Sequence, residues 1–261
     1  MSEAKARDTR TEAPGAVLIT GAARRIGRAI ALDLARGGWT VGVHYGRSTD
    51  AARAVVAEIE AMGGRAAAFA ADLAREAEVE TLVPRCVEAL GPLHCLINNA
   101  SVFENDRLAT ATRALWDLHL DVNLRAPVVL SRGFVTQLPA GAPGNIINLL
   151  DQRVWNLGPG FLSYTVSKSG LWAITRTLAM SLAPEVRVNG IGPGPTLPSR
   201  HQTDDEFAEH CARMPLGHGT TVEEICAAVR FILAAPAMTG QMIALDGGEH
   251  LTRGLRRGDE R

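Results

Sequence analysis

The sequence has few cysteines, almost no net charge and no clustered histidines. Its four cysteines, Cys86, Cys95, Cys211 and Cys226, form no C-x-x-C pair and lack metal-ligand spacing. We therefore expect reduced, partly buried thiols rather than a disulfide framework. The seven histidines are scattered singly, so we expect no metal site. A formal net charge of -1 argues against partners such as nucleic acid or an acidic membrane surface.

The sequence also lacks long apolar runs. No stretch is long enough for a transmembrane helix, and residues 1–14 are polar and charged, without the apolar core of a secretory signal. We expect a cytoplasmic protein with a flexible tail over residues 1–14. A second, mostly charged tail is expected over residues 252–261.

Between these tails, short apolar runs alternate with longer helical stretches, and hydrophobic residues make up 46% of the chain. The pattern predicts an α/β fold with a doubly wound parallel sheet. No repeat or linker interrupts it, so residues 15–251 are expected to form one domain. The expected strands are 16–19, 41–45, 66–71, 95–98, 145–149, 186–191 and 242–245. The expected helices are 25–37, 50–62, 76–90, 112–137, 164–183 and 222–234.

The motif Ser163-Tyr-Thr-Val-Ser-Lys168 is the strongest sign of chemistry. Residues four apart lie on the same face of a helix, so Lys168 is expected near the phenol of Tyr164. A positive charge lowers the pKa of a tyrosine from its usual value of about 10. Tyr164 is therefore predicted to act as a general acid or base, although Tyr-x-x-x-Lys alone also describes two surface residues.

A glycine-rich turn follows the first apolar run and opens a helix. It reads Thr20-Gly-Ala-Ala-Arg-Arg-Ile-Gly27. Glycines allow the backbone to approach a phosphate closely, and the helix N-terminus favours negative charge. This context predicts nucleotide binding rather than an ordinary turn between a strand and a helix.

The second strand indicates which dinucleotide is preferred. Folds that prefer NAD usually carry an acidic residue at its end, which binds the ribose hydroxyls. Here the chain reads His44-Tyr-Gly-Arg-Ser48, and no carboxylate appears before Asp50. Arg47, Ser48 and Arg25 instead supply donors for a 2′-phosphate, because arginine's planar fork matches phosphate geometry. We predict NADPH/NADP as the cofactor.

From about Ala16 to Gly248, the chain resembles the short-chain dehydrogenase/reductase family. The motifs occur in the family's order: the glycine turn, Asp72-Leu73, Asn98-Asn-Ala100, Asn123, the Tyr164–Lys168 pair and Pro193-Gly194. The resemblance implies a Rossmann-like fold with seven strands and a homotetramer. It implies cofactor contacts from Gly21, Arg25, Ile26, Gly27, His44, Tyr45, Arg47, Ser48, Asp72, Leu73, Asn99, Ala100, Ser101, Tyr164, Lys168, Pro193, Gly194 and Thr196. Asn123 would hold a water of the proton relay.

Two departures resemble the pteridine reductase branch of that family. Arg25 stands where the turn usually has a glycine, and Asp151 stands where a serine usually precedes the tyrosine by thirteen residues. The motif Asn98-Asn-Ala-Ser-x-Phe103 also fits. The resemblance implies a substrate site of Arg25, Phe103, Asp151 and Tyr164, with Phe103 stacked on a pterin ring. Asp151 would join Tyr164, Asn123 and Lys168 as catalytic residues.

A polar segment from about residue 196 to 216 interrupts the alternation, and the family carries a mobile substrate loop at this position. It is expected to form a lid. An ionised carboxylate only accepts hydrogen bonds, so Asp151 suits a substrate with N–H groups, and a protonated Asp151 could donate instead. Asp151 could also simply pair with Arg153.

Three functions remain open from the sequence. The first is NADPH-dependent hydride transfer to a pterin-like C=N bond. The second is a carbonyl reductase of the same fold, which should favour a hydroxyl donor at position 151. The third is a non-catalytic NADPH-binding protein, which would not need Asn123, Tyr164 and Lys168 together. The apolar residues Leu171, Trp172 and Leu178 give modest sequence support for a homotetramer, although core packing explains them equally well.

Overall fold

The computed structural model describes residues 14–199 and 202–252. The predicted tails, residues 1–14 and 252–261, lie almost wholly outside this range, as do Arg200 and His201 of the expected substrate loop. Within it, seven parallel strands form one sheet in the order β3-β2-β1-β4-β5-β6-β7. The strands are β1 (Ala16–Ile19), β2 (Thr40–Tyr45), β3 (Ala66–Ala70), β4 (Leu93–Asn98), β5 (Gly144–Leu149), β6 (Val186–Pro193) and β7 (Met242–Leu245).

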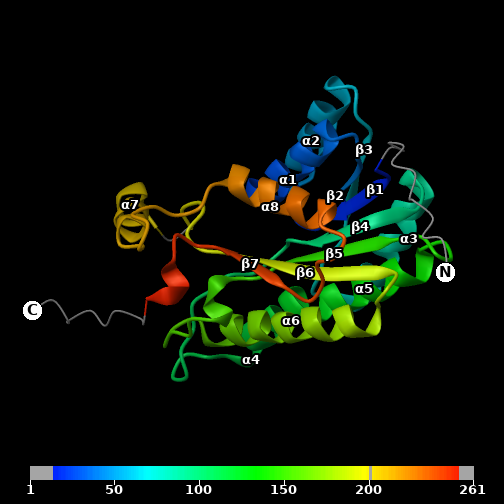
Figure 1. Ribbon diagram of the computed structural model, residues 1–261. Helices are drawn as coiled ribbons and strands as arrows, with labels where there is room; N and C mark the ends of the chain where they lie inside the picture. The colour runs from blue at the N-terminus through cyan, green and yellow to red at the C-terminus, as the bar shows by residue number, and fades with distance from the viewer. Residues whose placement is uncertain (1–13, 200–201, 253–261) are drawn as a thin grey trace, which may run out of the picture.

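Helices cover both faces of the sheet (Figure 1). One face carries α1 (Arg25–Arg36), α2 (Thr49–Ala61) and α8 (Val222–Ala234). The other carries α3 (Glu76–Leu90), α5 (Ala126–Gln137) and α6 (Leu162–Ser181), with α4 (Arg113–Leu120) packed against α6. The short α7 (Asp204–Ala212) lies away from the sheet, beyond the carboxyl ends of the strands. The predicted Rossmann-like doubly wound fold is confirmed.

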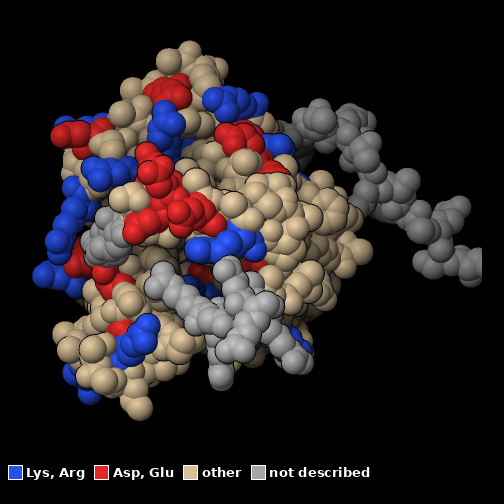
Figure 2. Space-filling model, turned by 90° about the vertical axis from the view of Figure 1, so that its left-hand side faces the viewer, with Lys and Arg blue, Asp and Glu red and all other residues tan. Residues whose placement is uncertain are grey.

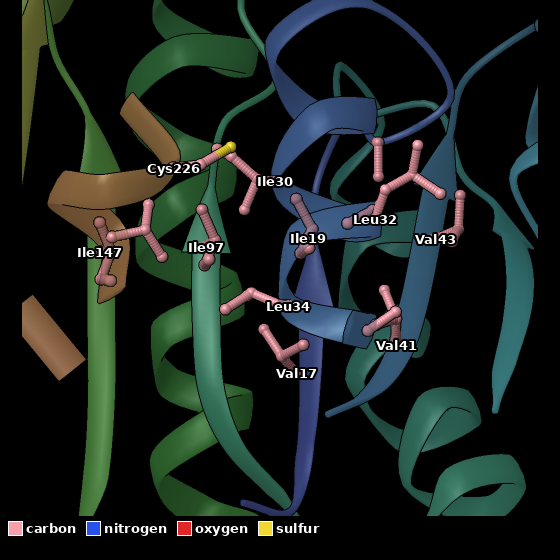
Figure 3. Close-up of a cluster of buried hydrophobic side chains, with 14 of the residues drawn as sticks. Val17, Ile19, Ile30, Leu32, Leu34, Val41, Val43, Ile97, Ile147 and Cys226 are labelled. Carbon is pink, nitrogen blue, oxygen red and sulfur yellow. The ribbon is translucent and has the colours of Figure 1, made fainter. Parts of the chain in front are cut away.

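The sheet has one apolar core on each face. In Figure 3, Val17, Ile19, Val41, Val43 and Ile97 from neighbouring strands meet Ile30 and Leu34 of α1. All of these strand side chains are fully buried. Each Å² of apolar surface that is buried stabilises the folded state by about 25 cal/mol, so these two layers contribute most to the stability of the fold. A rigid sheet results, and the segments that follow its strands are held in place.

Most predicted elements are confirmed to within two residues at either end, but the expected helix over 112–137 is wrong as a single element. A π-helical segment, Asp121–Arg125, separates α4 from α5. Such segments often occur at functional sites, and this one contains Asn123. The apolar pattern did not reveal it because α4 fully buries only His119, so no apolar stripe marks where α4 ends.

The α6 residues cited as sequence support for a tetramer pack inside the subunit. Leu171 is buried, and Leu178 and Trp172 pack against buried clusters. The large apolar side chains that α6 exposes are Val166 and Met180. Core packing therefore explains Leu171 fully and Trp172 and Leu178 in part, and an interface on α6 stays a prediction.

The strands all end on the same edge of the sheet, which α7 overhangs. In Figure 2, which looks onto this end, acidic and basic side chains of the described residues are mixed. None of the described helices is both long and apolar enough to span a membrane.

Candidate active site

A cavity of about 740 Å³ opens at the carboxyl edge of the sheet. It is bounded by the glycine turn, the segments after β4, β5 and β6, the start of α6, and α7. Of the predicted site residues, it is lined by Arg25, Ile26, Asn99, Ser101, Phe103, Asp151, Tyr164, Lys168, Pro193, Gly194 and Thr196. The remaining predicted residues, which do not line it, are Gly21, Gly27, His44, Tyr45, Arg47, Ser48, Asp72, Leu73, Ala100 and Asn123.

The glycine turn packs directly against the segment after β4. Gly21 has a left-handed φ of +63°, and a Cβ added to Gly27 would clash with the carbonyl oxygen of Gly21. The hydroxyl of Thr20 accepts hydrogen bonds from the backbone amides of Asn99 and Ala100, at 2.9 and 3.0 Å. The close approach that a dinucleotide phosphate requires is therefore built into the backbone.

Arg25 adopts a left-handed φ of 54°, a conformation that favours glycine, the residue that the resemblance implies at this position. The arginine keeps this uncommon conformation, as residues at functional sites often do. Its guanidinium donates a hydrogen bond of 3.2 Å to the carbonyl oxygen of Leu197. Arg25 thus joins the glycine turn to the beginning of the expected substrate loop.

His44 supports the glycine turn with both ring nitrogens. The Gly21 amide donates to Nδ1 at 3.0 Å, so Nε2 carries the proton and donates to the Ala71 carbonyl oxygen at 3.0 Å. Burial lowers the pKa of His44 to about 4, so the ring is neutral at physiological pH. Both nitrogens of its ring therefore bond the chain's own backbone, and the predicted cofactor contact of His44 stays a prediction.

The remaining predicted adenosine-side residues lie at the ends of β2 and β3. Arg47 is exposed and forms no ion pair with any residue that the structure describes. Ser48 and Tyr45 are half-buried beside it. Asp72 caps the turn into α3 by accepting from the Ala74 amide at 3.0 Å, and Leu73 is buried in the core. This arrangement leaves the Arg47 guanidinium available to a phosphate.

Tyr164 and Asp151 form the chemical centre of the cavity. The Tyr164 hydroxyl donates a hydrogen bond of 2.7 Å to Oδ2 of Asp151, and the Arg153 backbone amide donates to Oδ1 at 2.8 Å. Burial raises the pKa of Asp151, against the opposing effects of these hydrogen bonds and of nearby cations. Asp151 thus contacts Arg153 through the backbone amide, and no ion pair between the Asp151 carboxylate and the Arg153 guanidinium occurs among the described residues.

The expectation that Lys168 lowers the pKa of Tyr164 is wrong for the protein alone. Burial, followed by the charge of Asp151 and the hydrogen bond to it, raises the pKa of Tyr164 well above its usual value. The Lys168 Nζ lies 5.8 Å from the centre of the Tyr164 ring and donates to the Leu149 carbonyl oxygen at 2.7 Å. Burial lowers the pKa of Lys168 to about 8. The sequence reasoning missed the carboxylate as the stronger neighbour.

Asn123 does not reach the cavity with its side chain. Its Oδ1 accepts from the Val102 amide at 2.8 Å, and its Nδ2 donates to the Val102 carbonyl oxygen at 2.9 Å and to Ser167 Oγ at 3.1 Å. The π-helical segment therefore holds the loop that carries Ser101 and Phe103. The predicted role in a proton relay remains a prediction, and this side chain is already occupied.

Two aromatic rings wall the cavity beside Tyr164. Phe103 stacks on Phe161, with ring centres 4.4 Å apart and planes at 10°, and meets the edge of Tyr164 at 4.7 Å. The Arg153 guanidinium lies 4.8 Å from the centre of the Phe161 ring. The sequence analysis missed Phe161 and this role of Arg153. The sequence signal that could have pointed to Phe161 is its position about one helical turn before Tyr164.

Comparisons with known proteins identify the family. The family described as "Enoyl-(Acyl carrier protein) reductase" matches residues 21–250. A 3-oxoacyl-[acyl-carrier-protein] reductase from Synechocystis is 34% identical over 236 residues, covering 88% of this chain and 95% of the relative. A protein of the same description from Staphylococcus epidermidis is 33% identical, covering 90% and 98%. The chain belongs to the short-chain dehydrogenase/reductase family, and it is an oxidoreductase.

Solved structures place it within that family. FolM alternative dihydrofolate reductase 1 from Brucella suis, in complex with NADP, superposes with a TM-score of 0.89 at 46% identity, covering 92% of this chain and 96% of that one. A short-chain dehydrogenase from Burkholderia cenocepacia, in complex with NADP, gives 0.85 at 34% identity, covering 90% and 97%. The expected resemblance to a pteridine reductase-like branch is confirmed.

Proposed function

We propose that this enzyme uses NADPH to reduce a C=N bond of a pterin-like substrate. The observation that carries the proposal is the pair of Tyr164 and Asp151, whose oxygens lie 2.7 Å apart in a cavity walled by Phe103. A serine at position 151 would offer a hydroxyl donor to a carbonyl substrate. A carboxylate offers acceptors, which suit the ring and amino N–H groups of a pterin.

The cofactor is NADP(H). The similar structures from Brucella suis, Brucella canis and Burkholderia cenocepacia all contain NADP. When bound, the nicotinamide supplies the hydride. In this chain, Arg47 and Ser48 are the proposed ligands of the 2′-phosphate, because they follow β2, where an NAD-preferring fold carries an acidic residue. Arg25, in the glycine turn, is proposed to add positive charge for the cofactor phosphates.

The proton is proposed to come from the Tyr164–Asp151 pair. Two interacting groups titrate as a unit, so the proton they share belongs to the pair rather than to either oxygen. The Lys168 ammonium lies 5.8 Å from the centre of the Tyr164 ring and opposes the negative charge left after the proton departs. Tyr164 and Lys168 are buried and Asp151 is half-buried, so little bulk water reaches the group and these interactions are strengthened.

The substrate is proposed to lie with its flat ring against Phe103. Offset stacking of aromatic rings contributes about 0.5–1.5 kcal/mol beyond area burial. A saturated ketone gains neither this stacking nor the acceptors of Asp151. The similarity to a structure described as a dihydrofolate reductase supports the same substrate class.

The second candidate is reduction of a carbonyl group. It is favoured by the relatives described as 3-oxoacyl-[acyl-carrier-protein] reductases, at 33–34% identity. Such a substrate would use Tyr164 and Lys168 in the same way. It would meet the carboxylate of Asp151 where a hydroxyl donor would be more favourable.

A substrate panel distinguishes the two candidates. NADPH oxidation is followed with dihydrobiopterin, dihydrofolate, a small diketone and a 3-oxoacyl thioester, each over a full concentration range. The proposal predicts the highest kcat/KM for a dihydropterin or dihydrofolate. Turnover of only the diketone or thioester would establish the carbonyl reductase instead.

We further propose a homotetramer located in the cytoplasm, as the family resemblance implies. Val166, Ala173, Thr177 and Met180 form an exposed stripe of small and apolar residues along α6. Cys86, Cys95 and Cys226 are buried free thiols, which is consistent with a reducing compartment.

A further inference from the structure

The helix that carries Tyr164 has its N-terminal cap supplied by a distant loop. Its own N-cap residue, Phe161, has a left-handed φ of 58° and no side-chain hydrogen bond to the helix. The first amide groups of a helix lack partners within it. Here the Phe161 amide donates to Asn105 Oδ1 at 3.0 Å, the Leu162 amide to the Asp106 carbonyl oxygen at 3.2 Å, and the Ser163 amide to Asp106 Oδ1 at 3.0 Å.

Behind this cap, three buried polar side chains form a continuous chain. Ser163 Oγ donates to Asp106 Oδ2 at 2.6 Å and lies 2.7 Å from His119 Nδ1. The Glu104 amide donates to His119 Nε2 at 3.3 Å, so Nδ1 carries the proton and donates to Ser163. Burial lowers the pKa of His119, which favours this neutral ring.

This group has the composition of a hydrolytic triad but cannot act as one. The serine lies between the histidine and the aspartate, whereas a nucleophilic triad places the histidine in the middle. His119, Ser163 and Asp106 are exposed by 0%, 0% and 2%, and none of them lines the cavity. Their hydrogen bonds are all directed toward other parts of the chain.

The chain of hydrogen bonds links the two sides of the proposed substrate site. Ser163 directly precedes Tyr164, and Glu104 directly follows Phe103. The Asp106 carboxylate lies at the positive end of the α6 dipole, where a negative charge is favourable. The other end of the same loop is held at Val102 by Asn123. The distance between Phe103 and Tyr164 is thus set from behind both residues.

We propose that Asp106, Ser163 and His119 are positioning residues that fix Phe103 relative to Tyr164. The inference rests on the proposed function, because it assigns Phe103 and Tyr164 to the same substrate. Displacement of a reacting group by about 1 Å can lower a rate by about 10²-fold. Loss of these bonds should therefore impair turnover while leaving intact the proposed phosphate ligands of NADPH, which lie in the glycine turn and after β2.

The test compares Ser163→Ala and Asp106→Asn with Thr175→Val as the matched control. Thr175 is also buried on α6, and its replacement removes hydrogen bonds with Asn148 and Leu171. It lies three helical turns from Tyr164. We expect kcat/KM for dihydrobiopterin to fall at least about tenfold in the two variants, as the loss of one charged hydrogen bond would give. The NADPH Kd should change by less than about twofold, and Thr175→Val should keep wild-type kcat/KM.

A double-mutant cycle separates positioning from loss of stability. If Asp106 acts through Phe103, then Asp106→Asn should have little further effect on pterin kcat/KM in a Phe103→Ala background. Effects that multiply in the double variant would overturn the proposal. So would an equal loss of kcat/KM in Thr175→Val, or a parallel loss of NADPH binding.

The positioning role of Asp106, Ser163 and His119 can be tested even if the proposed function is wrong. A wild-type enzyme that reduces a diketone but no pterin would exclude the pterin reductase. The positioning role would then be judged on diketone kcat, which depends on Tyr164. A lower kcat in Ser163→Ala but not in Thr175→Val would support it, and equal kcat values would overturn it.

Discussion

At the bottom of the cavity, one exchangeable proton lies between the Tyr164 hydroxyl and the Asp151 carboxylate, whose oxygens are 2.7 Å apart. Tyr164 is buried and Asp151 is half-buried, and desolvation raises the pKa of each. Lys168 supplies a buried cation, and burial lowers its own pKa to about 8. The chemistry of the site follows from these three groups together.

Tyr164→Phe tests where the transferred proton comes from. The variant keeps the ring that meets Phe103 and removes only the hydroxyl. We expect kcat to fall by about 10²–10⁴-fold, the usual contribution of a general acid, with NADPH affinity unchanged. Stopped-flow turnover and fluorescence titration measure the two quantities. A variant that kept more than half of the wild-type kcat would show that another group donates the proton.

Lys168→Met tests the cost of the buried ammonium. Because its folded pKa is depressed from 10.5 to about 8, the penalty on folding is full below about pH 8 and disappears above about pH 10.5. From pH 8 to pH 10.5, the free energy of unfolding of the wild type should therefore rise relative to that of the variant, by about 3 kcal/mol in total.

Urea denaturation at pH 7, 9 and 10.5 measures this difference. The unpaired Leu149 carbonyl in the variant adds an offset that does not vary with pH, so only the change with pH is diagnostic. A difference in the free energy of unfolding that stays constant from pH 7 to 10.5 would contradict the depressed pKa of Lys168.

Among the elements, the glycine turn was predictable from the sequence only in part. The strand, turn and helix were predictable from short apolar runs and glycine spacing, because local backbone geometry dictates them. The partner of the turn was not predictable, since His44 reaches it only once β1 and β2 pair side by side. The π-helical segment at Asn123 was not predictable for the same reason, because its hydrogen bonds to Val102 and Ser167 form only in the folded protein.

His44→Leu tests the support of this turn. The substitution leaves the Gly21 amide and the Ala71 carbonyl without partners, and each buried unpaired group costs about 1–3 kcal/mol. We expect a lower free energy of unfolding and weaker NADPH binding. His94→Leu is the matched control, because the buried Nδ1 of His94 has no hydrogen-bond partner. Equal stability losses in the two variants would refute the supporting role of His44.

For the whole molecule, the alternation of short strands and helices predicted the sheet and the position of its ligand edge. It could not place Asp106 against Ser163 or stack Phe161 on Phe103, because these contacts join loops far apart in the chain. Contacts within one strand–turn–helix unit were accessible to sequence reasoning. Contacts between units required the folded sheet.

The exposed stripe on α6 leads to a prediction about assembly. We expect light scattering to give a mass four times that of the 27.8 kDa chain at micromolar concentration. Ala173→Glu places a charge in the middle of the stripe and should lower that mass. A wild-type monomer at this concentration, or a tetramer unaffected by Ala173→Glu, would refute assembly through α6.

The identity of residue 151 tests the central claim most directly. Steady-state NADPH oxidation is measured with dihydrobiopterin and with a diketone, for the wild type and for Asp151→Ser. Loss of the charged acceptor should lower pterin kcat/KM at least about tenfold, corresponding to about 1.5–3 kcal/mol, while diketone reduction is kept or increased. Unchanged pterin kinetics in Asp151→Ser, or a wild type that does not reduce the pterin, would contradict the assignment of this enzyme as a pterin reductase.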